Sequence, residues 1–241
     1  MSEQLQQDQQ KLRELIDAHQ RIVFFGGAGV STESGIPDFR SAGGVFDEKW
    51  PYPPEVMVSR SYFQKNPEWF YDFYRTKMIF PDAQPNACHR KLAELEAAGK
   101  VSAVVTQNID GLHQMAGSKK VLELHGSVHR NYCVNCGKRY GLEAITKSTG
   151  IPRCECGGTI RPDVVLYEEP LDDAVVEAAL KEIRSADMII VAGTSLVVYP
   201  AAGFLHYFGG DCLALVNKSE TSIDASANFV SRQPIGAMMD W

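Results

Sequence analysis

The feature that most constrains this chain is a repeated pattern in which a short apolar run stops abruptly at glycine or at polar residues. The runs are Arg21–Phe25, Val101–Val105, Val121–Leu124, Met188–Ala192 and Cys212–Val216. Helical spacing of apolar residues marks His89–Ala98 and Asp172–Arg184, which separate several of these runs. Strands that alternate with helices indicate an α/β fold, a parallel sheet with helices on both faces. Ligands of such sheets bind beyond the carboxyl ends of the strands, where these polar residues lie.

Composition narrows the classes of function. The 241 residues carry a formal net charge of −6, and 44% of them are hydrophobic, which is ordinary for a globular protein. The acidic balance lacks the electrostatic footprint of a general nucleic-acid or anionic-membrane binder, and no apolar stretch approaches the roughly 20 residues of a membrane helix. The polar start of the chain has no signal-peptide core, so we expect a cytoplasmic protein with no nucleic-acid or membrane partner.

A glycine-rich loop, Gly26–Gly35, follows the first predicted strand and is expected to open a helix, with Ser31 or Thr32 as its N-cap. Glycines let a backbone approach a phosphate, and a helix N-terminus offers free N–H donors. The loop is not the standard dinucleotide fingerprint, because Thr32 stands where that pattern has glycine, and it is not a P-loop, because no lysine follows its last glycine. An ordinary strand–helix turn is the alternative.

Four of the six cysteines form two close pairs, Cys133 with Cys136 and Cys154 with Cys156. The C-x2-C pair and its distance from the second pair are typical of a zinc ribbon, although the second pair, C-x-C, is one residue tighter than usual. Four thiolates complete a tetrahedral zinc site with no open position, so the predicted zinc is structural. Unpaired or redox-active thiols are the alternative. The remaining thiols, which we expect to be buried in packing, are Cys88 and Cys212.

Polar clusters follow two of the predicted strands. Gln107, Asn108 and Asp110 share the turn after the second run, where amides and a carboxylate suit ribose hydroxyls; an Asx-turn that only caps the next helix is the alternative. His125 follows the third run and can serve as a general base near neutral pH, although a lone histidine is more often structural. The histidines interpreted as structural are His19, His89, His113, His129 and His206.

Taken together, these motifs resemble the sirtuins, the NAD-dependent protein deacylases, and most of all the bacterial class with a short N-terminus. The segments that carry the resemblance occur in the family's order and span nearly the whole chain. They are GAGVSTESGIPDFR (27–40), TQNIDGLH (106–113), LELHGS (122–127), the four cysteines, IRPDVVLYEE (160–169), GTSLVVYPAAG (193–203) and LVNKSET (215–221).

The resemblance implies a larger, Rossmann-like NAD-binding domain and a smaller part that holds one structural zinc. The larger domain would comprise residues 1–40, 86–128 and 163–241, and the smaller part a helical insert at 41–85 and a zinc-ribbon insert at 129–162. NAD and acyl-lysine would enter the cleft between the two parts. The expected protein is a monomer that acts on acetyl-lysine proteins or peptides.

The same resemblance implies a set of NAD contacts. The diphosphate would lie on the glycine loop, the nicotinamide near the turn after the second run, and the adenosine near the last strand ends. The residues are Gly27, Ala28, Gly29 and Thr32 at the diphosphate; Phe39 and Arg40 over the nicotinamide; Gln107, Asn108, Ile109, Asp110 and His125 around the nicotinamide and its ribose; Gly193, Thr194, Ser195, Asn217 and Lys218 along the adenosine; and Ile235 at the adenine.

The implied reaction moves the acetyl group of acetyl-lysine to ADP-ribose and releases nicotinamide. The acyl oxygen would attack C1′ of the ribose, with His125 taking a proton from the ribose hydroxyls so that the 2′-oxygen attacks the acyl carbon, and Asn108 as a second catalytic residue. The substrate contacts would be Val164, Val165, Tyr167 and Val198. The backbone around 164–167 would pair with the peptide as an added strand.

Three departures from the family pattern bear on specificity and geometry. Members that prefer acidic acyl groups carry a Tyr-x-x-Arg pair, whereas here the residue three positions after Tyr74 is Lys77. A lysine lacks the bidentate fork with which arginine binds a carboxylate, so we expect deacetylation over desuccinylation. Arg75 could serve only if its helix were rotated by roughly 200°. Glu168 stands where many members have glycine, which would stiffen the substrate-pairing loop. The tight C-x-C pair leaves the zinc geometry open.

Other functions of the same NAD site are desuccinylation and mono-ADP-ribosyl transfer, and a non-enzymatic zinc-ribbon module could sense NAD without releasing nicotinamide. His125 and the apolar substrate residues argue against mono-ADP-ribosyl transfer as the main activity. An oxidoreductase is disfavoured because the glycine loop lacks the full fingerprint and no acidic residue follows a clear second strand at the expected distance.

Overall fold

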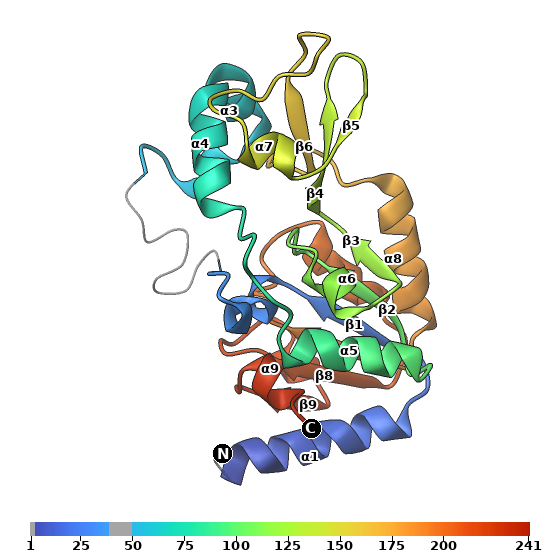
Figure 1. Ribbon diagram of the computed structural model, residues 1–241. Helices are drawn as coiled ribbons and strands as arrows, with labels where there is room; N and C mark the ends of the chain where they lie inside the picture. The colour runs from blue at the N-terminus through green and yellow to red at the C-terminus, as the bar shows by residue number, and fades with distance from the viewer. Residues whose placement is uncertain (1–2, 39–49) are drawn as a thin grey trace.

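The computed structural model describes residues 3–38 and 50–241 (Figure 1). Phe39 and Arg40 therefore lie outside the described residues. The larger part of the molecule is built on a six-stranded sheet in the order β3-β2-β1-β7-β8-β9, in which all neighbouring strands are parallel. Its strands are β1 (Ile22–Gly26), β2 (Val101–Thr106), β3 (Val121–Glu123), β7 (Met188–Ala192), β8 (Cys212–Val216) and β9 (Phe229–Ser231). The predicted α/β fold with a parallel sheet is confirmed.

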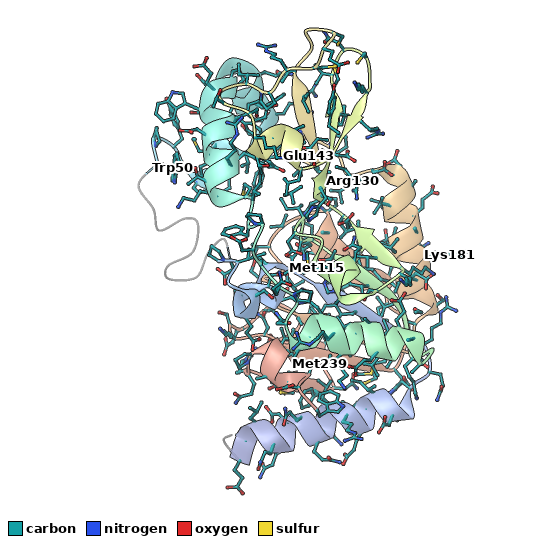
Figure 2. All side chains as sticks on the ribbon, in the orientation of Figure 1. Trp50, Met115, Arg130, Glu143, Lys181 and Met239 are labelled. Atoms are coloured by element: carbon teal, nitrogen blue, oxygen red, sulfur yellow. The ribbon has the colours of Figure 1, made fainter. Side chains whose placement is uncertain are left out.

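Helices cover both faces of this sheet. They are α1 (Glu3–Ala18), α5 (Ala87–Ala97) and α9 (Ile235–Met238) on one face, and α8 (Asp173–Ser185) and η4 (Ala201–Tyr207) on the other. Side chains alternate across a strand, so Ile22 and Phe24 of β1 pack with the first set while Val23 and Phe25 pack with the second. Met239, labelled in Figure 2, belongs to the buried layer under α1 and α5.

The smaller part joins two segments that are far apart in the sequence. It contains a three-stranded antiparallel sheet, β5-β4-β6, with short helices beside it. The elements are α2 (Pro54–Met57), α3 (Arg60–Lys65), α4 (Pro67–Lys77), β4 (Gly126–Cys133), β5 (Arg139–Tyr140), α7 (Glu143–Thr146) and β6 (Ile160–Val164). Phe70 and Phe73 of α4 share one core with Val128 of β4, and the Tyr71 hydroxyl donates a 2.7 Å hydrogen bond to the Ile160 carbonyl. The helical segment and the cysteine-bearing sheet thus pack as one body.

The glycine loop does not open an α-helix, and that prediction was wrong. The loop instead forms two 3₁₀ turns, η1 (Ala28–Val30) and η2 (Thr32–Ser34). Gly35 ends the second turn with φ 83°, and Pro37 follows, so the chain cannot continue as a helix. The predicted cap is also wrong: Ser31 makes no capping hydrogen bond, and the Thr32 hydroxyl donates to the Gly29 carbonyl over 3.0 Å.

The remaining elements are short connections, α6 (Leu112–Ala116) after β2 and η5 (Asp224–Ser226) before β9. Across residues 3–38 and 50–241, no helix is both long and apolar enough to cross a membrane.

Candidate active site

A cavity of about 530 Å³ lies at the carboxyl ends of the parallel strands and is lined by both parts of the molecule. Every described residue that the sequence assigns to NAD or to the substrate lines it. These are Gly27, Ala28, Gly29, Thr32, Gln107, Asn108, Ile109, Asp110, His125, Val164, Val165, Tyr167, Gly193, Thr194, Ser195, Val198, Asn217, Lys218 and Ile235. Residues from seven separate segments of the chain therefore meet around one cavity.

The glycine loop meets the end of β7 backbone to backbone. The Gly29 N–H donates to the Gly193 carbonyl over 2.8 Å. A Cβ on Gly29 would stand 2.7 Å from the Gly193 Cα, and one on Gly27 would stand 2.8 Å from the Gly193 carbonyl oxygen. Glycine is required at these positions because the two loops touch. The resulting wall of the cavity is backbone with few side chains, which suits an anionic group held by N–H donors.

A buried hydrogen-bonded cluster joins the glycine loop to the turn after β2. The Ser31 hydroxyl donates to Asp110 Oδ2 over 2.7 Å and accepts from Asn108 Nδ2 over 3.0 Å. Asp110 Oδ1 accepts the Leu112 N–H over 2.9 Å, so Asp110 also caps α6 as an Asx-turn. The Asx-turn interpretation is therefore confirmed, while the contact with ribose hydroxyls stays a prediction. Sequence reasoning gave Ser31 no role in the site, because its partner Asp110 lies 79 positions away in the chain.

A second link connects the ends of β2 and β7. The Gln107 side chain donates from Nε2 to Thr194 Oγ1 over 3.1 Å, and its backbone N–H donates to the Gly26 carbonyl over 2.9 Å. Thr194 Oγ1 also accepts the Leu196 N–H over 3.2 Å. The polar residues that follow three different strands are thereby fixed to one another before any ligand binds.

His125 lies in the turn between β3 and β4 and lines the cavity. Its Nδ1 stands 2.9 Å from the Gln107 carbonyl oxygen. A carbonyl only accepts, so Nδ1 carries the hydrogen in the neutral ring and Nε2 keeps a basic lone pair. Burial lowers the pKa of His125, and the hydrogen bond to the carbonyl opposes part of that shift. The imidazole is therefore neutral at pH 7 and suited to accept a proton.

Other histidines lie close to this site. His129 Nε2 stands 2.8 Å from the Asp110 carbonyl oxygen, and the residue lines the cavity, although only a structural role was predicted for it. His89 and His113 are buried with ring centroids 4.6 Å apart, between α5 and α6. Further cavity residues that sequence reasoning did not assign to a ligand include Ile36, Met115, Tyr199 and Gln233.

Tyr74 and Lys77 of α4 line the cavity, while Arg75 does not. Arg75 donates from Nε to the Ile145 carbonyl over 2.9 Å and from its guanidinium to Ser148 Oγ over 2.8 Å. These bonds hold it against the cysteine-bearing part. The Tyr74 hydroxyl is buried and has no hydrogen-bond partner among the described residues. The polar groups that α4 brings to the cavity are thus a phenol and an amine, without a guanidinium.

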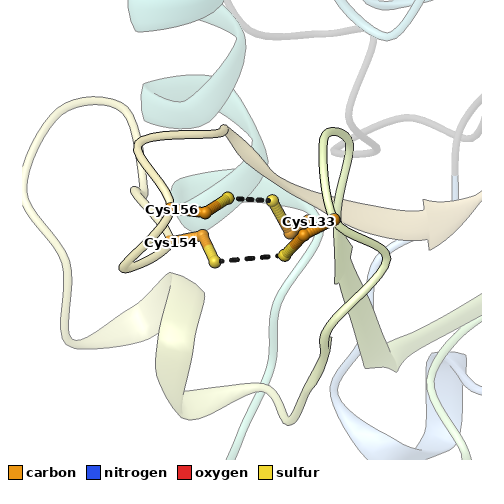
Figure 3. Close-up of side chains that lie close together, drawn as sticks. Cys133, Cys154 and Cys156 are labelled. Atoms are coloured by element: carbon orange, nitrogen blue, oxygen red, sulfur yellow. Dashed lines mark hydrogen bonds between the residues drawn. The ribbon is translucent and has the colours of Figure 1, made fainter.

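The four paired cysteines form a separate cluster outside the cavity (Figure 3). Their Sγ atoms all lie within 4.8 Å of one another, with Cys133 and Cys156 3.4 Å apart and Cys136 and Cys154 3.6 Å apart. A tetrahedral zinc with bonds of about 2.3 Å has sulfur–sulfur edges of about 3.8 Å, so this donor set fits one zinc ion despite the tight C-x-C pair. The two other thiols, Cys88 and Cys212, are buried in the core as predicted.

Comparisons with known proteins agree with one another. The Sir2 family model matches residues 27–200. A protein of Clostridium acetobutylicum named NAD-dependent protein deacetylase is 56% identical over 234 residues, covering 95% of this chain and 96% of the relative. One of the same name from Clostridium perfringens is 57% identical over 233 residues, with 95% and 96% covered.

Solved structures are similar over the same extent. A Sir2 variant with a deacetylated p53 peptide and 3′-O-acetyl ADP ribose has a TM-score of 0.88 and 39% identity, covering 96% of each chain. A Sir2 complex with p53 peptide and NAD+ has a TM-score of 0.85 and 40% identity, covering 95% of this chain and 94% of that one.

Proposed function

This chain belongs to the Sir2 family, and from that we propose that it is an NAD-dependent protein lysine deacetylase whose reaction takes place in the 530 Å³ cavity. It transfers the acetyl group of acetyl-lysine to ADP-ribose and releases nicotinamide. One observation carries the proposal: three features face one cavity. They are a neutral histidine whose Nε2 has no hydrogen-bond partner among the described residues, the Ser31–Asp110 cluster and the backbone wall of the glycine loop.

The chain's own residues divide the work of binding NAD, the co-substrate that supplies the ADP-ribose to which the acetyl group is transferred. We assign the diphosphate to the glycine loop and the adenosine to the residues that follow β7 and β8. The Ser31 hydroxyl orients the Asp110 carboxylate, which can accept an N–H from a carboxamide. Asn108 and Gln107 are fixed at the ribose side by their bonds to Ser31 and Thr194.

We assign proton transfer to His125. Its Nδ1–H is committed to the Gln107 carbonyl, which fixes the ring and leaves Nε2 as the one basic atom of this side chain. A base of this kind takes the proton from a ribose hydroxyl, which lets the 2′-oxygen attack the acyl carbon. The bond from that carbon to the lysine nitrogen then breaks, the amine leaves with a proton, and one solvent water supplies the oxygen that completes acetyl-ADP-ribose. The zinc would be held by the four cysteines and supplies only cross-linking of the ribbon, because their sulfurs fill all four positions of a tetrahedral site.

The substrate is a protein or peptide that carries acetyl-lysine. We place its side chain between Val165, Tyr167 and Val198, and its backbone beside residues 164–167. We further propose that the NAD-binding domain comprises residues 1–40, 86–128 and 163–241, and that the protein is a cytoplasmic monomer with no nucleic-acid partner. The acidic net charge of −6 supports the last point.

The test is incubation with an acetyl-lysine peptide, with and without NAD. We expect deacetylated peptide, nicotinamide and acetyl-ADP-ribose in equal amounts, and only when NAD is present. ADP-ribose attached to a protein acceptor would instead indicate a mono-ADP-ribosyltransferase. NAD binding with no release of nicotinamide would indicate a non-catalytic NAD sensor. Either of these outcomes overturns the proposal.

A further inference from the structure

The segment that follows β6, residues 164–169, lines the cavity and is the stretch to which the proposed function assigns the peptide backbone. Its first half is tied to the turn that carries His125, because the Val165 N–H donates to the His125 carbonyl over 3.0 Å. A shift of this segment would therefore move the bound peptide relative to His125, the proposed base. The rest of the segment is held by the smaller part of the molecule.

The backbone of Tyr167 pairs with the chain that enters α3. The Tyr167 N–H donates to the Val58 carbonyl over 3.1 Å, and the Arg60 N–H donates to the Tyr167 carbonyl over 3.0 Å. Together these bonds form a parallel bridge between Tyr167 and Ser59. One short bridge is a weak support by itself.

Glu168 strengthens this support with its side chain. Its carboxylate accepts two hydrogen bonds from Ser61 in the first turn of α3, one from the backbone N–H over 2.9 Å and one from Oγ over 2.6 Å. These bonds, with Lys65 and Arg60 nearby, hold the pKa of the Glu168 carboxyl below its usual range. Glu168 has φ 75°, a left-handed conformation that favours glycine, so the carboxylate bonds are made at a position where a side chain is otherwise unfavourable.

The neighbouring Glu169 anchors the segment from within. Its carboxylate pairs with Arg161 and accepts the Leu166 N–H over 2.9 Å, while its own N–H donates to the Leu166 carbonyl over 3.1 Å. Within the part of the chain that the structure describes, the Val165 carbonyl and the Glu168 N–H have no hydrogen-bond partner. Both residues line the cavity, so one acceptor and one donor remain for an extended peptide.

We propose that Glu168, through Ser61, is a positioning residue that sets the affinity for the peptide substrate, an inference that rests on the proposed function. The Glu168–Ser61 pair holds residues 164–169 in the conformation that pairs with the peptide, so less ordering is required when the peptide binds. The pair contributes to recognition of peptide backbone and leaves the NAD contacts unaltered, because neither Glu168 nor Ser61 bonds to a residue of the glycine loop or of the turn after β2.

The experiment compares Glu168→Ala, Ser61→Ala and the double variant with the unaltered protein. We expect Glu168→Ala to raise the KM for an acetyl-lysine peptide about fivefold, as for the loss of a hydrogen bond to a charged group at an exposed site. Ser61→Ala should raise this KM by a smaller factor, because the bond from the Ser61 backbone N–H remains. In both variants kcat and the KM for NAD should stay within about twofold. The double variant should match Glu168→Ala, because loss of the carboxylate already removes both bonds to Ser61. Fluorescence anisotropy of a labelled acetyl-lysine peptide should show the same loss of binding. Glu177→Ala, an exposed carboxylate on α8 away from the cavity, is the matched control.

Two results would overturn the inference. An unchanged peptide KM in Glu168→Ala and Ser61→Ala would show that the pair does not position the segment. A rise in the KM for NAD as large as the rise for peptide would show a general loss of structure instead of peptide positioning. Both of these results are measured in an enzyme that is active. If the unaltered protein shows no NAD-dependent deacetylation, the proposed function is overturned, and this inference with it.

Discussion

Ser31 and Asp110, 79 positions apart in the chain, are joined by a 2.7 Å hydrogen bond inside the cavity wall. Ser31 is buried, and its hydroxyl oxygen also accepts a hydrogen bond from the Asn108 side-chain amide. The glycine loop and the turn after β2 are therefore one hydrogen-bonded unit. Loss of the hydroxyl would leave both a carboxylate oxygen and an amide without their partner.

The first prediction concerns this unit. Ser31→Ala should raise the KM for NAD about tenfold or more, since a hydrogen bond to a charged group contributes about 1.5–3 kcal/mol. The peptide KM should change less, because no peptide contact is assigned to Ser31. Steady-state kinetics with each substrate varied in turn measures both values. Ser185→Ala, which removes an exposed hydroxyl on α8, serves as the control, and an unchanged KM for NAD would contradict the role of Ser31.

The second prediction tests the base. His125→Ala should keep its fold and its zinc but lose at least about 100-fold in turnover, the usual contribution of a positioned general base. Release of nicotinamide and acetyl-ADP-ribose measures the loss, and circular dichroism checks the fold. His206→Ala removes an exposed imidazole and should retain full activity. Near-native turnover in His125→Ala would show that another group accepts the proton.

The third prediction is the pH profile that follows from the same residue. Burial lowers the pKa of His125 below the ordinary value of about 6.5, and a base works only when deprotonated. Activity as kcat/KM should therefore rise with pH along an acid limb whose midpoint lies below 6.5, and stay level through pH 7. A midpoint above 6.5 would mean that a different group titrates or that the histidine is held in its charged form.

The fourth prediction concerns the four-cysteine cluster. The protein should contain one zinc per chain, and Cys136→Ser should lose it, with a lowered Tm and a loss of several kcal/mol in the free energy of unfolding, because zinc binding contributes directly to folding. Elemental analysis and thermal unfolding measure the two effects. Cys212→Ala, which alters a thiol in the main core, should keep its zinc. Full stability after complete removal of the metal would exclude a structural zinc.

The fifth prediction concerns acyl choice. Since Arg75 is bonded to the ribbon and the cavity receives Tyr74 and Lys77, an acetyl-lysine peptide should be turned over with a higher kcat/KM than the succinyl-lysine peptide of the same sequence. Lys77→Arg supplies a bidentate fork and should shift the ratio of the two kcat/KM values toward succinyl. A preference of the unaltered protein for succinyl-lysine would contradict this prediction.

The sequence was most informative where one physical signal dominates. Buried parallel strands are continuous apolar runs, so β1, β2, β7 and β8 were each found to within a residue or two. The cysteine pairs were found because metal ligands need fixed spacing. The strand β9 was missed, since it has three residues, Phe229–Ser231, of which only Ser231 is buried, and a run that short carries no periodicity.

The errors lie where long-range contacts override local pattern. The helix expected after Gly26 is replaced by two 3₁₀ turns, and Ser31 bonds to Asp110 instead of capping a helix. That partner is 79 positions away, so no local rule predicts it. Arg75 was not mispredicted, but its position also depends on distant partners, Ile145 and Ser148 of the cysteine-bearing segment.

The shared core of the smaller part also constrains how the chain is made. Phe70, Tyr71, Phe73 and Tyr74 of α4 are fully buried, partly against Ile160 and Val164 of β6, and α4 ends 87 residues before β6 does. At a synthesis rate of about 5–20 residues per second, the aromatic helix waits roughly 4–17 s on the ribosome before its partner strand is complete. These rings lack that partner for the whole interval, so α4 is one apolar segment that must stay protected from other contacts during synthesis.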